Sequence, residues 1–347
     1  MNKLGFGIVG CGAIAPLHAE AIKSLSDTAL LVAVSSNIKE EAKAFGEKYG
    51  IDWYEDYHDL LSRNDIDVVC VCTPSGTHAE IAMEAARFGK HVLVEKPLDI
   101  NLERIDSIIR TCEKAGVKLG VVFQLRFTKA FQMTYQAVRN GRFGRLVLGE
   151  ARVKTYRSRD YYKSSDWKGT WAMDGGGALM NQSIHAVDLL QWMMGPVKSV
   201  YAYTDTLVHE IEVEDTAVAV LRFANGALGT LVGSTATFPG LPKYLEIHGS
   251  TGGVVVEEDT IKKWNFSEKR EEDKLAGQTG GEIGSAYSDP VKGLSFAGHK
   301  LVIKDMIEAI LDNREPLVNG WEARKSVEII LAVYKSARSG KEINLPL

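Results

Sequence analysis

Short apolar runs alternate with amphipathic stretches over the first part of the chain. Runs of this kind, rich in valine and isoleucine, predict buried parallel strands, and apolar positions three and four residues apart predict helices packed against them. The expected strands are Leu4–Val9, Leu30–Val34, Asp52–Tyr54, Ile66–Cys72, His91–Val94 and Val117–Phe123. Because helical patterns separate them, the sequence predicts an α/β domain with a doubly wound parallel sheet over residues 1–123.

The hydrophobic pattern changes after Gln124. A helical stretch at 129–140 is followed by segments in which apolar and polar residues alternate, and Asn225-Gly226 is typical of a hairpin turn. We therefore expect an α+β domain over residues 124–298 with a large, open, mostly antiparallel sheet. Residues 274–298 lack periodicity and predict a loop or lid, whereas 299–313 and 321–339 predict two amphipathic helices.

Composition and charge narrow the classes of protein that fit this pattern. The 347 residues suggest two domains, and 45% hydrophobic with 25% charged residues describe a globular protein. A formal net charge of -4 argues against binding nucleic acid or an anionic membrane surface. No apolar run is long enough to span a bilayer, and no small-residue cleavage site follows the amino terminus, so we expect a cytoplasmic protein.

The cysteines, Cys11, Cys70, Cys72 and Cys112, are best interpreted as buried, reduced thiols. Cys70 and Cys72 would point to the same side, because alternate residues of a strand share a face. No second cysteine or histidine pair has the spacing of metal ligands, so the sequence predicts no metal site.

The first predicted strand runs directly into Gly10-Cys11-Gly12-Ala13-Ile14-Ala15, which has the pattern G-x-G-x-x-A. The first glycine allows a tight turn, the second lets the backbone approach a pyrophosphate, and the small last residue lets helix and strand pack closely. The helix that follows presents N–H groups and the positive end of its dipole to an anion. We therefore predict a dinucleotide site formed by Gly10, Gly12, Ala13, Ile14 and Ala15.

Ser35, Ser36 and Asn37 end the second predicted strand, where an NAD-binding domain often has an acidic residue for the ribose hydroxyls. In the sequence no carboxylate stands there to repel a 2′-phosphate, and Lys39 is near enough to attract one, but no arginine is present to clamp it. The expected cofactor is therefore NAD or NADP, with a slight lean to NADP.

Glu95-Lys96-Pro97 follows the predicted strand His91–Val94, at the carboxyl end where ligands bind in open α/β sheets. Proline fixes its own φ and so restricts the loop, and a lysine held there could place its ammonium group beside a bound cofactor. The alternative is an ordinary lysine on a strand-to-helix loop.

A predicted helix over Gly177–Met194 carries Asn181, His185, Asp188 and Trp192 at spacings that place them on one face. A histidine there could accept a proton near neutral pH, with Asn181 orienting its ring or the substrate. The alternative is a core histidine capped by Asp188. The glycine triplet at 175–177 allows close approach by a backbone or a ligand, which favours a site.

Together these motifs resemble those of the glucose–fructose oxidoreductase, inositol dehydrogenase and rhizopine-catabolism family. The shared features are the G-x-G-x-x-A start, Thr73-Pro74 with His78, Glu95-Lys96-Pro97, and the glycine triplet followed by Asn181 and His185-x-x-Asp188. The resemblance covers the whole chain in order and spacing. It implies a Rossmann domain at 1–123, a substrate-binding and oligomerisation domain at 124–298, and carboxyl-terminal helices, 299–347, that pack back on the first domain.

The resemblance also implies roles for individual side chains. Lys96 would reach the reacting hydroxyl and the nicotinamide ribose, and His185 would take or give the hydroxyl proton. Many members have an aspartate one turn before this histidine, but here Asn181 carries no charge to stabilise an imidazolium. Cofactor contacts outside the glycine loop would come from Ser35, Ser36, Asn37, Thr73, Pro74, His78, Glu95, Lys96 and Gln124.

Substrate contacts are expected at the domain junction and in the polar, aromatic stretch that follows it, from Gln124, Arg126, Tyr161, Trp167, Lys168, Trp171 and Asn181. For the aromatic side chains, packing or a subunit contact is an equal alternative. Arg126, Arg157, Arg159 and Lys168 would suit an acidic or phosphorylated sugar, unless they are only solvated charges. The stretch Gln124-Leu125-Arg126 is similar to nucleotide-sugar uronate dehydrogenases of the family.

The expected activity is hydride transfer between NAD(P) and a secondary alcohol or ketone of a sugar, inositol or nucleotide sugar. One alternative is a glycoside hydrolase of the same family that uses transient oxidation and re-reduction. Another is a non-catalytic dinucleotide sensor, which would need neither Lys96 nor His185. Because an open sheet face usually needs a cover, a homodimer or homotetramer is expected.

Overall fold

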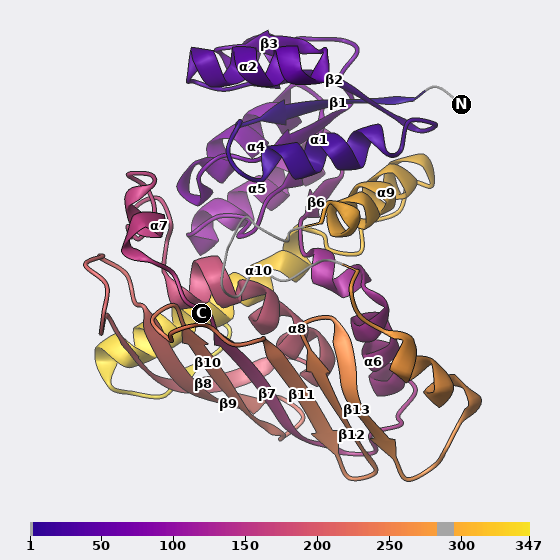
Figure 1. The fold of residues 1–347 in the computed structure, drawn as a ribbon, viewed down its shortest axis with the longest axis vertical. Coiled ribbons are helices and arrows are strands. Elements are labelled where there is room, and N and C mark those ends of the chain that lie inside the picture. The colour runs from indigo at the N-terminus through magenta and orange to yellow at the C-terminus, as the bar shows by residue number, and fades with distance from the viewer. Residues whose placement is uncertain (1–2, 283–294) are drawn as a thin grey trace. The chain divides into compact units, whose positions relative to one another are not determined.

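The computed structural model describes residues 3–282 and 295–347, which divide into two compact units (Figure 1). Unit 1 comprises residues 3–124 and 295–324, and unit 2 comprises residues 125–282 and 325–347. The long helix α10 (Gly320–Ser339) begins in unit 1 and continues in unit 2. Within the described ranges, no helix is both long enough and apolar enough to cross a membrane.

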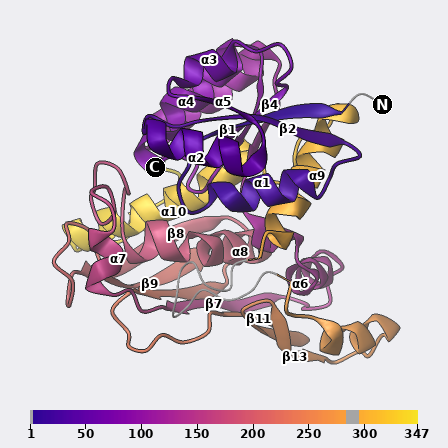
Figure 2. The ribbon, with the colours of Figure 1, turned by 45° about the horizontal axis from the view of Figure 1, so that its top comes forward.

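Unit 1 is built on a parallel sheet, whose described strands follow the order β3-β2-β1-β4-β5-β6. They are β1 (Leu4–Val9), β2 (Ala29–Ser35), β3 (Asp52–Tyr54), β4 (Val68–Val71), β5 (His91–Val94) and β6 (Leu119–Val121). Helices lie on both faces of the sheet, so the strand interiors are buried and apolar (Figures 1 and 2). The strand order reverses between β1 and β4, which confirms the predicted doubly wound sheet.

Capping side chains and glycines set the ends of helices in unit 1, as α5 illustrates. They are α1 (Ala15–Lys23), α2 (Lys39–Tyr49), α3 (Tyr57–Leu61), α4 (His78–Arg87), α5 (Leu102–Ala115) and α9 (Ala297–Leu311), with a 3₁₀ turn η1 (Ser75–Thr77). In α5, the Asn101 side chain accepts hydrogen bonds from two N–H groups of the first turn, and Gly116 ends the helix with φ +69°. α9 comes from far along the chain and packs beside α1 (Figure 2).

Unit 2 is built on a mixed sheet, whose described strands follow the order β13-β12-β11-β7-β10-β9-β8-β14. They are β7 (Leu146–Lys154), β8 (Val197–Asp205), β9 (Thr216–Phe223), β10 (Leu228–Ser234), β11 (Tyr244–Gly249), β12 (Gly252–Glu257), β13 (Thr260–Phe266) and β14 (Ile343–Asn344). Among these neighbours β7 and β10 run parallel and the other pairs run antiparallel. The predicted, mostly antiparallel sheet is therefore confirmed.

Helix α8 lies along one face of this sheet, across β7 and β11 (Figure 1). Gly149 on β7 permits this approach, because a Cβ there would lie 2.7 Å from Cγ of Met194. The helices of unit 2 before α10 are η2 (Gln124–Phe127), whose first residue belongs to unit 1, α6 (Lys129–Arg139), α7 (Arg159–Lys163), the π-helical η3 (Ala178–Ser183), α8 (Ile184–Met194) and the 3₁₀ helix η4 (Glu271–Gln278).

An apolar stripe on the same sheet is exposed in this chain. Along β9, buried residues alternate with Val218 and Val220, which are 48% and 53% exposed. Val218 pairs with Tyr203 on β8, which is 71% exposed. Such alternation is typical of a strand with one face on the core and the other face open. We define these three residues as the apolar stripe.

The structure differs from the predicted elements in several places. Of the predicted loop 274–298, the first residues lie in η4 and the last two begin α9, whereas 283–294 lie outside the described residues. The predicted helix 177–194 begins as the π-helical turn η3 before it becomes α8. Strands β13 and β14 were not expected, because β13 mixes lysines with apolar residues and β14 is a short edge strand.

Candidate active site

The loop after β1 has the backbone that a dinucleotide requires. Gly10 has φ +103°, and a Cβ there would lie 2.7 Å from the carbonyl oxygen of Cys72, so glycine is needed. A Cβ at Gly12 would meet nothing within 4 Å, which leaves this side of the loop open to a ligand. The loop continues through Ala13 and Ile14 into the start of α1 at Ala15. These features fit the pyrophosphate of a dinucleotide at a helix amino terminus.

The end of β2 carries a carboxylate that the sequence interpretation missed. Ser36 Oγ donates a hydrogen bond of 3.4 Å to Oε2 of Glu41, on the first turn of α2. Burial raises the pKa of the Cys11 thiol to about 11, and the negative charge of Glu41 adds to this rise, so Glu41 also lies near the glycine loop. Ser35 is buried and Asn37 is exposed. The expectation that no acidic group is present at this strand end is therefore wrong.

The loop after β4 is held from behind by His78. Thr73 and Pro74 form the loop, and Oγ1 of Thr77 donates to the Pro74 carbonyl at 2.8 Å. The buried His78 ring places one nitrogen 2.8 Å from the Pro97 carbonyl oxygen and the other 2.9 Å from that of Thr73. His78 therefore joins this loop to the Glu95-Lys96-Pro97 loop.

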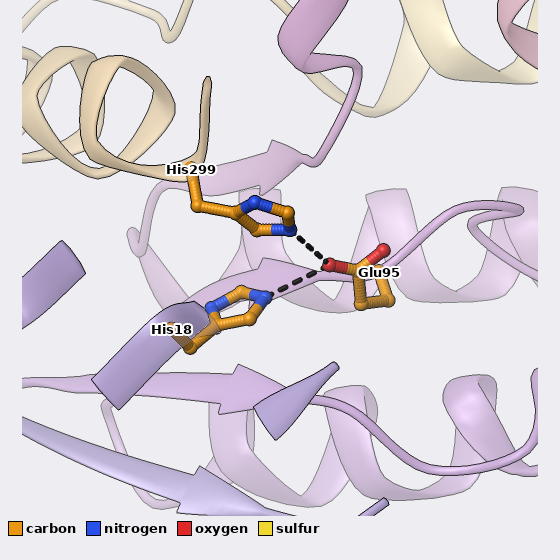
Figure 3. Close-up of side chains that lie close together, drawn as sticks. All are labelled: His18, Glu95 and His299. Atoms are coloured by element: carbon orange, nitrogen blue, oxygen red, sulfur yellow. Dashed lines mark hydrogen bonds and ion pairs between the residues drawn. The ribbon is translucent and has the colours of Figure 1, made fainter. Parts of the chain in front are cut away.

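Lys96 follows β5 at the carboxyl edge of the parallel sheet, where the sequence placed it. The preceding residue, Glu95, is buried and lies between the imidazole rings of His18 and His299 (Figure 3). Its second oxygen, Oε2, accepts the Lys96 N–H at 3.2 Å. The Glu95 carboxylate therefore binds groups of unit 1 itself.

In unit 2, Glu214 holds the start of the π-helical turn. Its carboxylate accepts hydrogen bonds from the N–H groups of Gly177 at 3.0 Å and Leu179 at 2.8 Å, and from the Tyr334 hydroxyl at 2.9 Å. Burial raises the pKa of Glu214. A Cβ at Gly177 would lie 2.1 Å from the Glu214 carbonyl oxygen. The glycine triplet therefore admits a neighbouring chain segment, which is one of the two explanations that the sequence offered.

A buried carboxylate stands beside Asn181. Asn181 Nδ2 donates a hydrogen bond of 2.5 Å to Oδ1 of Asp174, and Asn181 Oδ1 accepts from Gln182 Nε2 at 2.7 Å. Asp174 is 2% exposed and also accepts the Gly169 N–H at 3.0 Å. His185 lies one turn further along, at the start of α8, and is partly exposed. Residue 181 is therefore uncharged, but a negative charge lies next to it.

The carboxylate of Asp188, on α8, forms an ion pair with an arginine. Arg126 donates from Nε and Nη2 to the two Asp188 oxygens, both at 2.7 Å, and Ser326 Oγ donates to Oδ1 at 3.1 Å. Arg126 is 1% exposed, and its guanidinium lies 5.0 Å from the ring centre of Trp192. Arg126 thus forms a buried ion pair within unit 2, and Asp188 serves as its counter-charge.

Several predicted substrate residues gather around Tyr161. Gln182 Nε2 donates to the Tyr161 hydroxyl at 3.0 Å, and Arg157 Nη2 donates to Gln182 Oε1 at 2.7 Å. The cationic groups of Arg157 and Lys168 lie 5.5 Å and 4.5 Å from the Tyr161 ring centre, and Lys168 Nζ also lies 5.9 Å from the Trp167 ring centre. Burial raises the pKa of Tyr161 to about 12, so its hydroxyl is protonated at neutral pH. This polar, basic group joins Asn181 through Gln182.

Two other predicted site residues, Trp171 and Gln124, make no hydrogen bond or ring contact with the group around Tyr161 among the described residues. Trp171 packs edge-on against Tyr334 at 5.2 Å between ring centres, and its ring faces the Arg338 guanidinium at 4.7 Å, so it contacts α10. Gln124 closes unit 1, and its Oε1 is buried without a hydrogen-bond partner among the described residues.

A parallel sheet of this topology, with an open glycine loop before α1, defines a dinucleotide-binding enzyme of the Rossmann class. Residues 4–123 match the family model described as "Oxidoreductase family, NAD-binding Rossmann fold", and residues 131–255 match the model of the GFO/IDH/MocA C-terminal domain. Because the two models cover most of the chain, the protein belongs to the GFO/IDH/MocA family of oxidoreductases, as the motifs indicate.

Relatives of known structure or name cover most or all of the chain. The WlbA dehydrogenase from Bordetella pertussis, solved with NADH and UDP-GlcNAcA, is 36% identical with a TM-score of 0.90 and covers 100% of both chains. A myo-inositol 2-dehydrogenase of Thermotoga maritima is 30% identical and covers 98% of both chains. An inositol 2-dehydrogenase of Rhizobium meliloti is 30% identical over 73% of this chain and 75% of its own.

These comparisons confirm an NAD-dependent oxidoreductase that acts on CH–OH groups. The lean to NADP is not confirmed, since the family model describes an NAD-binding fold and the WlbA structure holds NADH. The glycoside hydrolase alternative has no support among these relatives, which are named as dehydrogenases.

Proposed function

We propose that the protein is an NAD-dependent dehydrogenase that oxidises a secondary alcohol of an acidic nucleotide sugar of the UDP-GlcNAcA type. The supporting observation is the match along the entire chain, at 36% identity, to a dehydrogenase whose structure holds that ligand with NADH. The inositol dehydrogenases at 30% identity make myo-inositol the second candidate substrate.

Positive charge around Tyr161 supports the acidic substrate. The guanidinium of Arg157 and the ammonium group of Lys168 lie 5.5 Å and 4.5 Å from the ring centre of Tyr161. These two cationic groups suit a carboxylate or a diphosphate, because both anions bind arginine and lysine strongly. A neutral polyol such as myo-inositol would not need them.

Glu41 supports NAD over NADP. Its carboxylate lies beside Ser36 at the end of β2, where the adenosine ribose of a dinucleotide binds in this fold. A carboxylate there accepts hydrogen bonds from both ribose hydroxyls and repels a 2′-phosphate. Gly10, Gly12, Ala13 and Ile14 would hold the pyrophosphate.

Bound NAD supplies a hydride acceptor, and the chain supplies the groups that handle the proton. We assign to Lys96 the stabilisation of negative charge on the substrate oxygen, because a fixed ammonium group lowers the pKa of a hydroxyl beside it. We assign to His185 the removal of the proton from the same hydroxyl as general base. Asn181 holds the substrate, and the Asp174 carboxylate fixes the orientation of Asn181.

The test is an assay of UDP-GlcNAcA, UDP-GlcNAc and myo-inositol, each with NAD and with NADP. The absorbance of NADH or NADPH is the readout, and it is measured both in steady state and in a single turnover. We expect NADH from UDP-GlcNAcA and little from UDP-GlcNAc, which lacks the sugar carboxylate, or from myo-inositol, which carries no charge. Lys96→Ala should lower turnover by roughly 10³-fold with NAD still bound, and His185→Ala should lower it similarly without recovery at alkaline pH. Lys114→Ala, at an exposed position on α5, is the matched control.

Oxidation of myo-inositol but not of UDP-GlcNAcA would replace the proposed substrate with the second candidate. Near-normal turnover of Lys96→Ala would remove the lysine from the mechanism.

We also propose that the apolar stripe is the contact between subunits, because an open apolar sheet face is a typical subunit interface.

A further inference from the structure

Three buried side chains from distant parts of unit 1 meet behind the proposed catalytic lysine. Oε1 of Glu95 accepts hydrogen bonds from Nε2 of His18, on α1, at 2.8 Å and from Nε2 of His299, on α9, at 3.2 Å (Figure 3). His18 is 0% exposed, His299 3% and Glu95 7%. The histidines come from the helix that follows the glycine loop and from a helix of the carboxyl-terminal segment.

The spacing is that of hydrogen bonds and not of metal ligands. The three donor atoms lie within 4.8 Å of one another, so a metal ion is a geometric option. Ligands about 2.1 Å from a tetrahedral zinc ion are about 3.4 Å apart, whereas His18 and Glu95 are separated by 2.8 Å. Metal-bound histidines also donate their other ring nitrogen, but Nδ1 of His18 and of His299 has no hydrogen-bond partner among the described residues.

The hydrogen bonds keep Glu95 ionised inside the protein. Burial alone would raise the pKa of its carboxyl, yet the hydrogen bonds from His18 and His299 hold it well below its usual value. Burial lowers the pKa of His18, so this ring is neutral at pH 7 and donates its single N–H to Glu95. A buried carboxylate with these donors is fixed in place, because each lost hydrogen bond would leave an unsatisfied charge.

The fixed carboxylate in turn holds the backbone at Lys96. Glu95 Oε2 accepts the Lys96 N–H at 3.2 Å, and on the other side the Pro97 carbonyl lies 2.8 Å from Nδ1 of His78. The backbone on both sides of the lysine is therefore tied to buried histidine rings. These two attachments restrict the backbone from which the Lys96 side chain extends.

We propose that His18 and His299, acting through the Glu95 carboxylate, are positioning residues that set the placement of Lys96 relative to the dinucleotide-binding helix α1. This inference rests on the catalytic role of Lys96 in the proposed function. It assigns the histidines no contact with substrate or cofactor. Their effect on the reaction passes through the lysine alone.

A double-mutant cycle tests the proposal with the full-length protein. Glu95→Gln keeps the shape of the side chain but removes its charge. It should lower kcat by about 100-fold, since a misplacement of about 1 Å costs a factor of this size, and leave the NADH dissociation constant within about threefold. In the Lys96→Ala background the same change should alter the residual rate by less than about twofold.

A second pair of variants keeps the proposal testable if Glu95→Gln does not fold. His299→Gln retains an N–H donor for Glu95 and should keep kcat within about threefold, whereas His299→Leu has none and should lose about 30-fold or more. His58→Leu, at an exposed histidine of the same unit, is the matched control and should behave as wild type.

The outcomes separate this proposal from the proposed function. Wild-type kcat in Glu95→Gln, or equal losses with and without Lys96, would overturn the positioning role, as would identical behaviour of His299→Gln and His299→Leu. If instead Lys96→Ala retains full turnover, the assigned mechanism itself fails.

Discussion

Asn181 donates a hydrogen bond of 2.5 Å to Asp174, a residue seven positions earlier whose carboxylate is buried. The motif position at which the family resemblance predicts an aspartate is thus an amide here, and the Asp174 carboxylate lies directly beside it. Because the hydrogen bond to a charged acceptor is strong, Asp174 fixes which face of the Asn181 amide is presented. The negative charge is therefore on Asp174 and not on residue 181, and it affects the proposed site through the hydrogen bond to Asn181.

Removing the charge behind Asn181 should impair catalysis more than folding. In Asp174→Asn the new amide no longer favours the Nδ2 donor of Asn181, so Asn181 loses its fixed orientation and we expect kcat/KM to fall about 10-fold to 100-fold. Steady-state kinetics with UDP-GlcNAcA and NAD measure the change. Asp160→Asn, at an exposed aspartate on α7, is the control, and equal kinetics in the two variants would contradict the role of Asp174.

Breaking the buried pair of Arg126 and Asp188 should destabilise the protein. Asp188→Ala leaves the Arg126 guanidinium, 1% exposed, without its counter-charge, and we expect a loss of about 3–5 kcal/mol in the free energy of unfolding. Urea denaturation followed by circular dichroism measures it. The exposed pair Lys43–Glu47 provides the comparison, and Glu47→Ala should cost less than about 1 kcal/mol. A similar small cost for Asp188→Ala would show that Arg126 finds other partners.

Removing the carboxylate at the end of β2 should relax cofactor choice. In Glu41→Ser the repulsion of a 2′-phosphate disappears, so the ratio of NADP to NAD affinity should rise about 10-fold. Titration of NADPH and NADH fluorescence measures both affinities. Glu40→Ser, at the neighbouring exposed glutamate, should leave the ratio unchanged. If the wild type prefers NADP, or if the ratio does not move, Glu41 is not the selecting group.

Acid should weaken unit 1 through its buried histidines. Burial lowers the pKa of His78 below its usual 6.5, and the same holds for His18. The unfolded chain therefore takes up these protons first, so the stability they contribute is present above pH 6.5 and is lost as the pH falls toward the folded-state pKa.

Thermal unfolding at about pH 7.5 and about pH 5.5 measures this dependence. The midpoint of wild type should fall between the two values, and that of His78→Gln should fall less. The exposed His58 serves as control, because His58→Gln should reproduce the wild-type difference. An equal fall in His78→Gln would assign the acid sensitivity to other groups.

The apolar stripe should mediate self-association. Val218→Glu with Val220→Glu places two charges on an exposed strand face, which would have to be desolvated in an interface. We expect the oligomer to dissociate while both units stay folded, as measured by light scattering after size-exclusion chromatography. A wild-type monomer, or an intact oligomer of the double variant, would locate the subunit contact elsewhere.

The parallel sheet, the glycine loop and the position of Lys96 could all be predicted from the order of the amino acids. Apolar runs separated by helical patterns specify strands and helices locally, and the order of the elements then restricts the topology. Gly10 and Lys96 could be located because each stands directly after a strand, at an edge that the topology fixes.

The surroundings of these residues, in contrast, depend on contacts that form only when the chain folds. Glu95 meets His18 across 77 positions and His299 across 204, and Arg126 meets Asp188 across 62. No local pattern encodes such a pair, because charged and polar residues look alike in sequence whether they are solvated or buried against a partner. Ser36 and Glu41 are close in sequence, but the turn into α2 had to be known before the carboxylate could be placed beside the strand end.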